Sequence, residues 1–160
     1  MPTYHMNRKE KEITDRGALI GILKQGKFAS IGMCRGDEPY LVTMNYGYDQ
    51  ERNALYFHCA LKGLKLDFVR SNPRVCGTVI EDRGYKIGEC DQAYRSVVFW
   101  GSMYVVEDLQ EKKRAIDVLL DHLEDDPDRV REKSLKSDDV YQKVGILRLD
   151  IDEMTGKQGG

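Results

Sequence analysis

Alternation of hydrophobic and polar residues dominates the first half of the chain and predicts a run of short β-strands. One helix precedes them, at Asp15–Gln25, with Thr14 as its N-cap and Gly26 at its C-terminal end. Alternating segments then recur at Lys27–Cys34, Tyr40–Tyr48 and Ala54–Cys59. Turn-forming residues separate these segments, so neighbouring strands should pair as antiparallel hairpins.

The segments that follow switch between helix and strand. Leu64–Val69 has the spacing of a short helix, and the β-branched run Val75–Ile80 predicts another strand. Ser96–Val106 is the most apolar strand, and a long hairpin loop over Glu81–Asp91 should connect it to the preceding one. Gly101, in the middle of this apolar strand, indicates a β-bulge or a close backbone approach.

The last third of the chain adds helices and one more strand. Asp108 and Glu111 have the spacing of a capping box, which starts an amphipathic helix. Asp126-Pro127 starts a shorter helix, and Val144–Ile151 alternates as a final strand. Six strands in a largely antiparallel sheet can remove their edges by closing into a small Greek-key barrel. The pattern therefore predicts a mainly β fold with flanking helices.

Composition and charge suit one ordinary domain. The 160 residues, 41% hydrophobic and 32% charged, are expected to form a single unit over residues 1–160. The formal net charge of −2 gives no basic field for nucleic acid or an anionic membrane. No apolar run reaches the ~20 residues that cross a bilayer, and residues 1–12 lack the apolar centre of a signal peptide. We therefore expect a cytoplasmic protein.

The four cysteines, Cys34, Cys59, Cys76 and Cys90, form no C-x-x-C pair. In a reducing compartment they are expected to be free and mostly buried thiols. A zinc site built on His58 and Cys59 is the alternative, although adjacent strand residues point to opposite faces. We therefore predict no metal site.

The junction where the Ala54–Cys59 strand ends and a helix begins offers a site for an anion. Helix N-termini present unpaired N–H groups, and Gly63 leaves room for an anion to approach the backbone. Lys62 and Lys65 add positive charge, and His58 adds a hydrogen-bonding ring. The same residues also suit a solvated turn, so their spacing leaves phosphate binding as one of two interpretations.

Two strands carry side chains that suit a planar aromatic ligand, or simply an ordinary barrel. Thr43 and Asn45 share one strand face, and Met44 and Tyr46 share the other. Trp100, the only tryptophan, packs either in the core or against a ring or a partner chain. Catalytic signatures such as G-x-S-x-G, the P-loop, H-E-x-x-H and G-x-G-x-x-G are absent.

The order and spacing of several segments carry a family resemblance. The segments are Pro39–Tyr46, Leu55–Ala60, Gly63–Lys65 and Asn72–Val75, with Arg8–Asp15 before them and Tyr94–Val98 after them. Together they resemble the pyridoxamine 5′-phosphate oxidase-like flavin-binding split barrels, and most of all the nitroimidazole-resistance (Nim) branch. The resemblance extends over roughly residues 6–156 and implies a six-stranded FMN-binding split barrel.

The resemblance also implies a cofactor and a partner, namely FMN held at the interface of a homodimer. The residues that match the phosphate and ribityl region are His58, Lys62, Gly63 and Lys65. Those that match the strand along the isoalloxazine ring are Thr43, Met44, Asn45 and Tyr46. Those that match the strand beside the ring, contributed by the partner subunit, are Tyr94, Arg95, Ser96 and Trp100.

The implied activity is that of an oxidoreductase. FMN that a small-molecule donor has reduced would pass its electrons to a small acceptor such as a nitroaromatic compound, with His58 as a hydrogen-bonding candidate. A non-catalytic FMN store or sensor is one alternative, and a haem binder with His58 as axial ligand is another.

Two departures from the family pattern narrow these expectations. The C-terminal arginine- and histidine-bearing segment of true pyridoxamine-phosphate oxidases is missing, so vitamin B6 oxidation is not expected. Gly63-Leu64-Lys65 also stands where many members have two adjacent basic residues, and this difference would lower the affinity for FMN.

Overall fold

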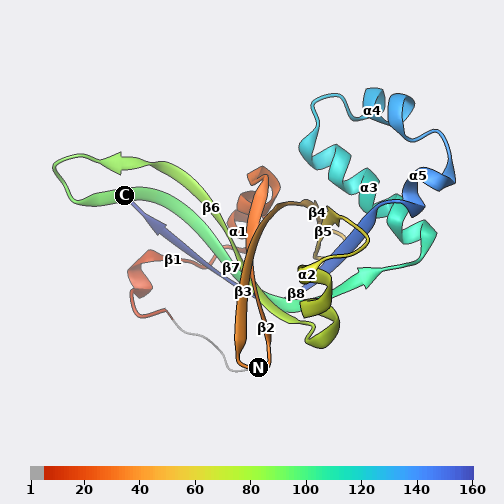
Figure 1. Ribbon diagram of the computed structural model, residues 1–160. Coiled ribbons are helices and arrows are strands. Elements are labelled where there is room, and N and C mark those ends of the chain that lie inside the picture. The colour runs from red at the N-terminus through yellow and green to blue at the C-terminus, as the bar shows by residue number, and fades with distance from the viewer. Residues whose placement is uncertain (1–5) are drawn as a thin grey trace.

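The computed structural model describes residues 6–160, which form one eight-stranded sheet with helices around it (Figure 1). The strands are β1 Glu12–Ile13, β2 Phe28–Arg35, β3 Glu38–Asn45, β4 Gly47–Asp49, β5 Ala54–Cys59, β6 Arg74–Lys86, β7 Asp91–Val106 and β8 Gly145–Gly159. The helices are α1 Arg16–Gln25, α2 Leu64–Ser71, α3 Leu109–Leu123, α4 Pro127–Ser134 and α5 Asp138–Gln142, after a 3-10 turn η1 at Lys9–Lys11.

The strand order is β3-β2-β6-β7-β8-β5-β4, with β1 added to β8, and every pair is antiparallel. The expected mainly β, antiparallel fold with flanking helices is confirmed, but the expected count of six strands is wrong. The described residues form eight, because β1 was not predicted and because one expected strand is divided in two.

The division falls at Tyr46, inside the segment expected to be a single strand over Tyr40–Tyr48. β3 pairs with β2, whereas β4 pairs with β5. Between them the Tyr46 N–H donates to the carbonyl of Lys27 at 3.2 Å, and the Tyr46 hydroxyl donates to the carbonyl of Leu23 at 2.6 Å. The chain changes partner strand at this corner, while the alternation of side chains continues through it.

Two other strands are longer than expected. The loop expected over Glu81–Asp91 is wrong, because β6 and β7 stay paired out to Lys86 and Asp91, with one irregularity between Asp82 and Tyr85. The polar residues and glycines of this segment lie in a two-stranded ribbon with little core beneath it, so their sequence pattern resembles that of a loop. β8 likewise continues beyond Ile151 to Gly159, because β7 provides a partner along its whole length.

Local details of the strands and helices mostly follow the prediction. The β7–β8 register shifts between Trp100 and Gly101, as expected, and a Cβ at Gly101 would overlap the carbonyl oxygen of Asp150. Asp108 caps α3 as expected, through the N–H of Glu111 at 2.9 Å.

Asp126 likewise caps the expected helix α4. At α1 the cap is Asp15, not Thr14: its carboxylate accepts the N–H of Ala18 at 3.0 Å. α5 was not predicted.

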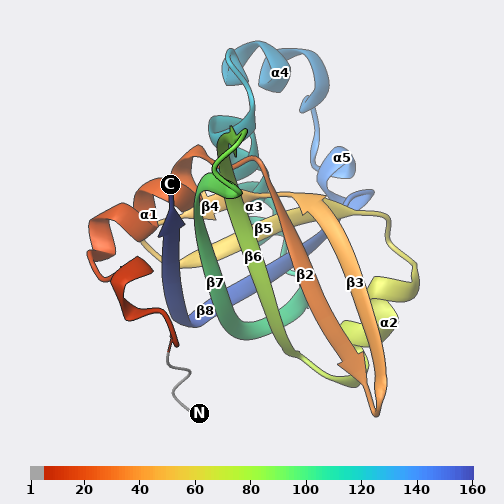
Figure 2. The same cartoon turned by 90° about the vertical axis from the view of Figure 1, so that its left-hand side faces the viewer.

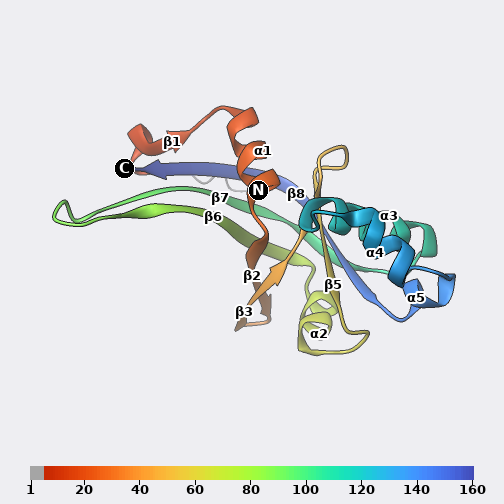
Figure 3. The same ribbon diagram turned by 90° about the horizontal axis from the view of Figure 1, so that it is seen from above.

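The apolar side chains form two clusters. One fills the barrel and includes Leu23, Ile31, Phe57 and Phe99. The other lies between α3 and the sheet and includes Tyr56, Ala115, Leu119 and Ile146. The face of β3, β2, β6 and β7 that points away from the barrel core has no helix of the described chain in front of it (Figure 2). Seen from above, the ribbon of β6 and β7 extends to one side, and α3, α4 and α5 lie on the other (Figure 3).

None of the helices in residues 6–160 combines the length and the apolar character that a membrane crossing requires.

Candidate functional site

The uncovered side of the sheet is built from rows of directly paired residues, which share a face. One row runs Leu41, Gly32, Cys76, Trp100 and Glu153 across β3, β2, β6, β7 and β8. The next row runs Thr43, Ser30, Thr78, Val98 and Thr155. We call the side of the sheet that carries these rows the outer face.

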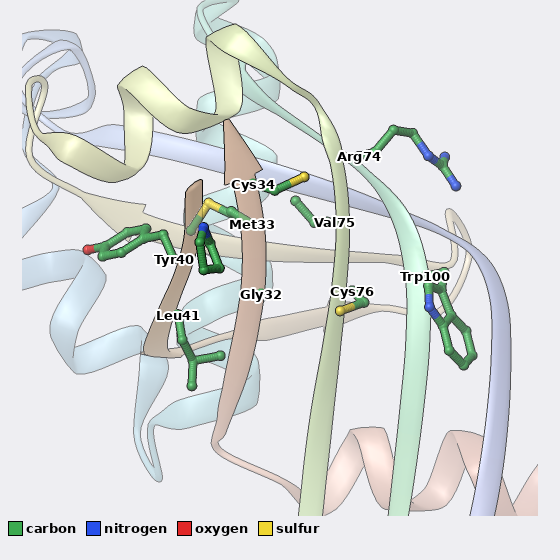
Figure 4. Close-up of a pocket in the computed structure, with 10 residues that line it drawn as sticks. Gly32, Met33, Cys34, Tyr40, Leu41, Arg74, Val75, Cys76 and Trp100 are labelled. Carbon is green, nitrogen blue, oxygen red and sulfur yellow. The ribbon is translucent and has the colours of Figure 1, made fainter. Parts of the chain in front are cut away.

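A groove of about 690 Å³ opens on the outer face, and Figure 4 shows the side chains around it. Its walls are mostly apolar and include Tyr40, Leu41, Cys76 and Trp100. At its edge the Arg74 guanidinium donates to Ser102 at 3.1 Å and to Asp152 at 2.8 Å. A broad apolar groove with a few polar groups at its margin suits a flat organic ligand.

Several of the predicted ring-binding residues do lie on the outer face. The hydroxyls of Thr43 and Ser30 are hydrogen-bonded at 2.8 Å, and the Asn45 amide donates to the carbonyl of Lys27 at 3.0 Å. Trp100 lines the groove, and Ser96 lies on the same side of β7, two alternations further along. Tyr94 follows Ser96 on that side.

Other predicted residues point elsewhere. The Met44 and Tyr46 side chains are buried in the barrel core, so only their backbone is open to a ligand. Arg95 alternates with Ser96 and points to the opposite face, where it donates to Glu81 at 2.7 and 2.9 Å. The structure therefore separates the predicted ring-binding residues into outward-facing and inward-facing sets.

The predicted phosphate site lies at the β5–α2 junction. His58 is exposed near the end of β5, and Lys62 is exposed in the loop that follows. Gly63 has φ +153°, a value that residues with side chains rarely adopt, and no side chain of the described residues 6–160 caps the helix that starts after it. Lys65, in the first turn, is half-buried. The first N–H groups of α2 are therefore open to an anion.

Lys112 on α3 adds a second cation that the sequence reasoning missed. It is only 9% exposed, and its ammonium donates to the carbonyl of Val144 at 3.0 Å. Burial raises the pKa of the Cys59 thiol, while the charges of Lys65 and Lys112 act in the opposite direction, so both lysines lie near the end of β5. Neither lysine has an acidic partner within residues 6–160.

Lys112 also lines a cleft of about 200 Å³, together with Arg70, Glu107 and Gly145. Its ammonium forms no ion pair within residues 6–160, so an anion placed beside it would offset part of the cost of its burial. The sequence does indicate that Lys112 is buried, because its spacing places it on the apolar face of α3 with Ala115, Ile116 and Leu119.

Helix α2 links the junction to the groove. Its first residues form the junction, and at its other end the Asn72 amide donates to the Cys34 thiol, at the groove wall, at 3.1 Å. Eight residues of helix span about 12 Å. The junction and the groove are thus neighbouring parts of one site. A ligand that occupies both has to be elongated, with an anionic group at one end and a flat group at the other.

His122, in the last turn of α3, is half-buried. Its Nδ1 accepts the N–H of Tyr48 at 3.3 Å, which leaves Nε2 as the donor to the Gly26 carbonyl at 2.6 Å. Burial lowers the pKa of His122, so the neutral ring is favoured. His122 therefore joins α3 to the α1–β2 connection and does not reach the candidate site.

The four cysteines are free, but the expectation that most are buried is wrong. Cys34 and Cys59 are half-buried, and Cys76 and Cys90 are exposed. Residues 6–160 contain no group of three or more side chains placed to hold a metal ion.

The antiparallel sheet has an apolar core on one side and a groove on its uncovered side, which is the architecture of a split β-barrel. The chain matches the pyridoxamine 5′-phosphate oxidase family over residues 15–158 and therefore belongs to that family.

Several solved structures share the fold. A protein assigned to 5-nitroimidazole antibiotic resistance in Bacteroides thetaiotaomicron VPI-5482 has a TM-score of 0.78 and 25% identity, covering 99% of this chain and 97% of that one. The FAD and heme binding protein from Mycobacterium smegmatis has a TM-score of 0.78 and 21% identity, covering 92% and 73%. The FAD-binding protein mll6688 from Mesorhizobium loti has a TM-score of 0.66 and 20% identity, covering 91% and 95%.

One curated sequence, the uncharacterized protein RA0666 of Rhizobium meliloti (strain 1021), is 34% identical over 70 residues. The match covers 43% of this chain and 44% of that protein, so the matched part of this chain spans less than half the length of its relative.

Proposed function

We propose that this chain is an FMN-binding flavoprotein that acts as a homodimeric oxidoreductase on a small acceptor such as a nitroaromatic compound. Membership of the pyridoxamine 5′-phosphate oxidase family supports a flavin. So do the two similar structures whose descriptions name FAD. The similarity to the nitroimidazole-resistance protein supports the acceptor class.

The observation that carries the proposal is the pairing of an anion site with a flat groove at the two ends of α2. Lys65 and Lys112 lie near its N-terminus, and within residues 6–160 neither has an acidic partner. Cys34 and Trp100 line the groove beyond its C-terminal end. FMN has the matching chemistry, with a terminal phosphate at one end and a three-ring system at the other.

The residues of the chain have separate roles in this proposal. Lys65, Lys112 and the N–H groups after Gly63 would hold the phosphate through charge-assisted hydrogen bonds. Trp100 would pack against the ring system, and Thr43 would offer a hydroxyl at its edge. His58 would be a hydrogen-bonding group near the junction. The flavin, when bound, supplies the redox chemistry, and the protein supplies position and exclusion of water.

The homodimer is part of the proposal because one chain leaves the groove open. A ligand pocket normally encloses most of its ligand, and a broad groove on a bare sheet face does not. A second copy would cover the groove and create two equivalent sites.

Replacement of Lys65 by Glu tests the phosphate site. A lost hydrogen bond to a charged group costs about 1.5–3 kcal/mol, so the Kd for FMN, measured by flavin fluorescence, should rise at least tenfold. The matched control is Lys133→Glu on α4, which makes the same charge change at an exposed lysine away from the site.

An unchanged Kd in Lys65→Glu would place the phosphate elsewhere. A haem absorption spectrum, or no flavin binding by the wild type, would overturn the proposal that the cofactor is FMN. Oxidation of a reduced nicotinamide by a nitroaromatic compound, dependent on bound FMN, would separate an oxidoreductase from an FMN store.

A further inference from the structure

The groove on the outer face is lined by sulfur as well as by apolar carbon. Cys34 of β2 and Cys76 of β6 both lie in its wall, and the sulfur of Cys76 points toward β2 (Figure 4). Two of the four free thiols of the chain are therefore placed where a flat organic ligand would bind. Cysteine sulfur is a strong nucleophile, so a thiol in a ligand groove can react with the ligand that the groove holds.

The four cysteines differ in how open their sulfur atoms are. Burial raises the pKa of Cys59, which lowers its share of the reactive thiolate. Cys34 is half-buried, and its sulfur already accepts the Asn72 amide at 3.1 Å. Cys76 and Cys90 are both exposed, but of these two only Cys76 lines the groove. Within residues 6–160, Cys76 is therefore the one exposed thiol that lies in the wall of the groove.

Gly32 leaves the Cys76 sulfur accessible. The two residues are directly paired across β2 and β6, and a Cβ at position 32 would lie 3.3 Å from the Cys76 sulfur. A side chain there would crowd the thiol, whereas glycine leaves it open on the β2 side. On its other side Cys76 pairs with Trp100 of β7, whose indole offers a flat surface to an aromatic ring. An aromatic compound packed against Trp100 would thus lie beside an open thiol.

We propose that Cys76 is a site of covalent modification by aromatic electrophiles that enter the groove, and that the adduct excludes the flavin. Nitrosoarenes, the two-electron reduction products of nitroaromatic compounds, are the electrophiles that the proposed function would generate. The inference rests on the proposed function only in naming the flavin and the nitrosoarene. The reactivity of Cys76 toward an added electrophile does not depend on it.

The reaction with a nitrosoarene balances without any further reagent. The Cys76 sulfur attacks the nitroso nitrogen, so an S–N bond forms and the N=O double bond becomes a single N–O bond. The thiol proton ends on that oxygen, which gives the N-hydroxy sulfenamide R–S–N(OH)–Ar. The adduct has the mass of the protein plus one nitrosoarene, and its rearrangement to a sulfinamide leaves that mass unchanged. The groove favours the step because it holds the ring beside the sulfur.

The adduct and the flavin need the same surface. In the proposed function the flavin ring packs against Trp100, which is the neighbour of Cys76 across β6 and β7. An aryl group on the Cys76 sulfur would occupy that part of the groove. Bound FMN should therefore protect the thiol, and modification of the thiol should prevent FMN from binding.

The test treats the flavin-free full-length chain with nitrosobenzene for short times and locates the adducts by peptide mass spectrometry. Cys90 is the internal control, because it is exposed but lies in the turn between β6 and β7, outside the groove. Iodoacetamide, which has no aromatic ring, measures the intrinsic reactivity of the same two thiols. Cys76→Ser removes the nucleophile at an exposed position, and circular dichroism verifies its fold.

The ratio of the Cys76 rate to the Cys90 rate should be at least about tenfold higher with nitrosobenzene than with iodoacetamide. FMN bound beforehand should slow the modification of Cys76 at least about tenfold. After treatment, the Kd for FMN should rise at least about tenfold in the wild type and stay at its untreated value in Cys76→Ser.

Equal ratios for the two reagents, or faster modification of Cys34 or Cys59, would overturn the assignment to Cys76. An unchanged Kd for FMN after complete modification of Cys76 would overturn the exclusion of the flavin. Selective modification of Cys76 by nitrosobenzene in a chain that binds no FMN would support the modification site and overturn the proposed function instead.

Discussion

The substitution Tyr46→Phe separates a structural from a ligand-binding role for a residue that the family resemblance places along the flavin ring. In the structure the side chain is 0% exposed, and its hydroxyl donates to the Leu23 carbonyl at 2.6 Å. Leu23 lies in the last turn of α1, where carbonyls have no partner within the helix. Loss of the hydroxyl therefore leaves a buried acceptor without its donor.

An unsatisfied buried acceptor costs about 1–3 kcal/mol. For a chain of this size that lowers Tm by about 2–4 °C per kcal/mol. With an m-value of about 2 kcal/mol/M, a loss of 2 kcal/mol lowers the urea midpoint by about 1 M. The FMN affinity at 25 °C should stay unchanged, since no atom of the side chain reaches the outer face.

Urea titrations at one fixed protein concentration, followed by circular dichroism, measure the stability. The control is Tyr85→Phe, because Tyr85 is an exposed tyrosine of β6, near the end of the β6–β7 ribbon. A stable Tyr46→Phe variant with weakened FMN binding would refute the reasoning, because it would place the hydroxyl at the ligand.

Two further predictions concern pH and packing. Burial holds the pKa of His122 below its ordinary value near 6.5, so the unfolded chain binds the proton more readily than the folded one. The free energy of unfolding should thus be constant above about pH 6.5 and fall as the pH drops below it, and His122→Gln should flatten that slope in urea titrations between pH 5 and 8. Gly101→Ala forces a Cβ onto the Asp150 carbonyl and should lower the free energy of unfolding by about 1–3 kcal/mol in the same assay. A fully stable Gly101→Ala would contradict the close approach at the bulge.

Local signals in the sequence predicted much of the fold. The strand β5 was predicted at both ends, Asp108 was identified as the cap of α3, and Gly101 was identified as a bulge. Each of these features depends on residues within a few positions of one another. Alternation, caps and breakers act at that range, which is why they can be recognised without a structure.

Features that depend on distant segments escaped prediction. The break at Tyr46 reflects a change of partner strand, and alternation continues across it. The segment Glu81–Asp91 was expected to be a loop, because the strands of the β6–β7 ribbon have no barrel core beneath them there to impose an apolar face. Lys112 and Lys65 lie 47 positions apart, and only the packing of α3 against β5 brings both near Cys59. The candidate site could therefore be predicted in its types of residue but not in its full membership.

The most direct test of the account is a comparison of FMN with riboflavin, which has the same ring system but no phosphate. Titration of the ligand-free protein with each flavin, followed by fluorescence, gives two values of Kd and the stoichiometry. The account predicts one FMN per chain and a Kd for FMN at least tenfold lower than that for riboflavin, since the proposed role of Lys65 and Lys112 is to bind the phosphate. Equal affinities for the two flavins, or the absence of saturable binding of either, would contradict it.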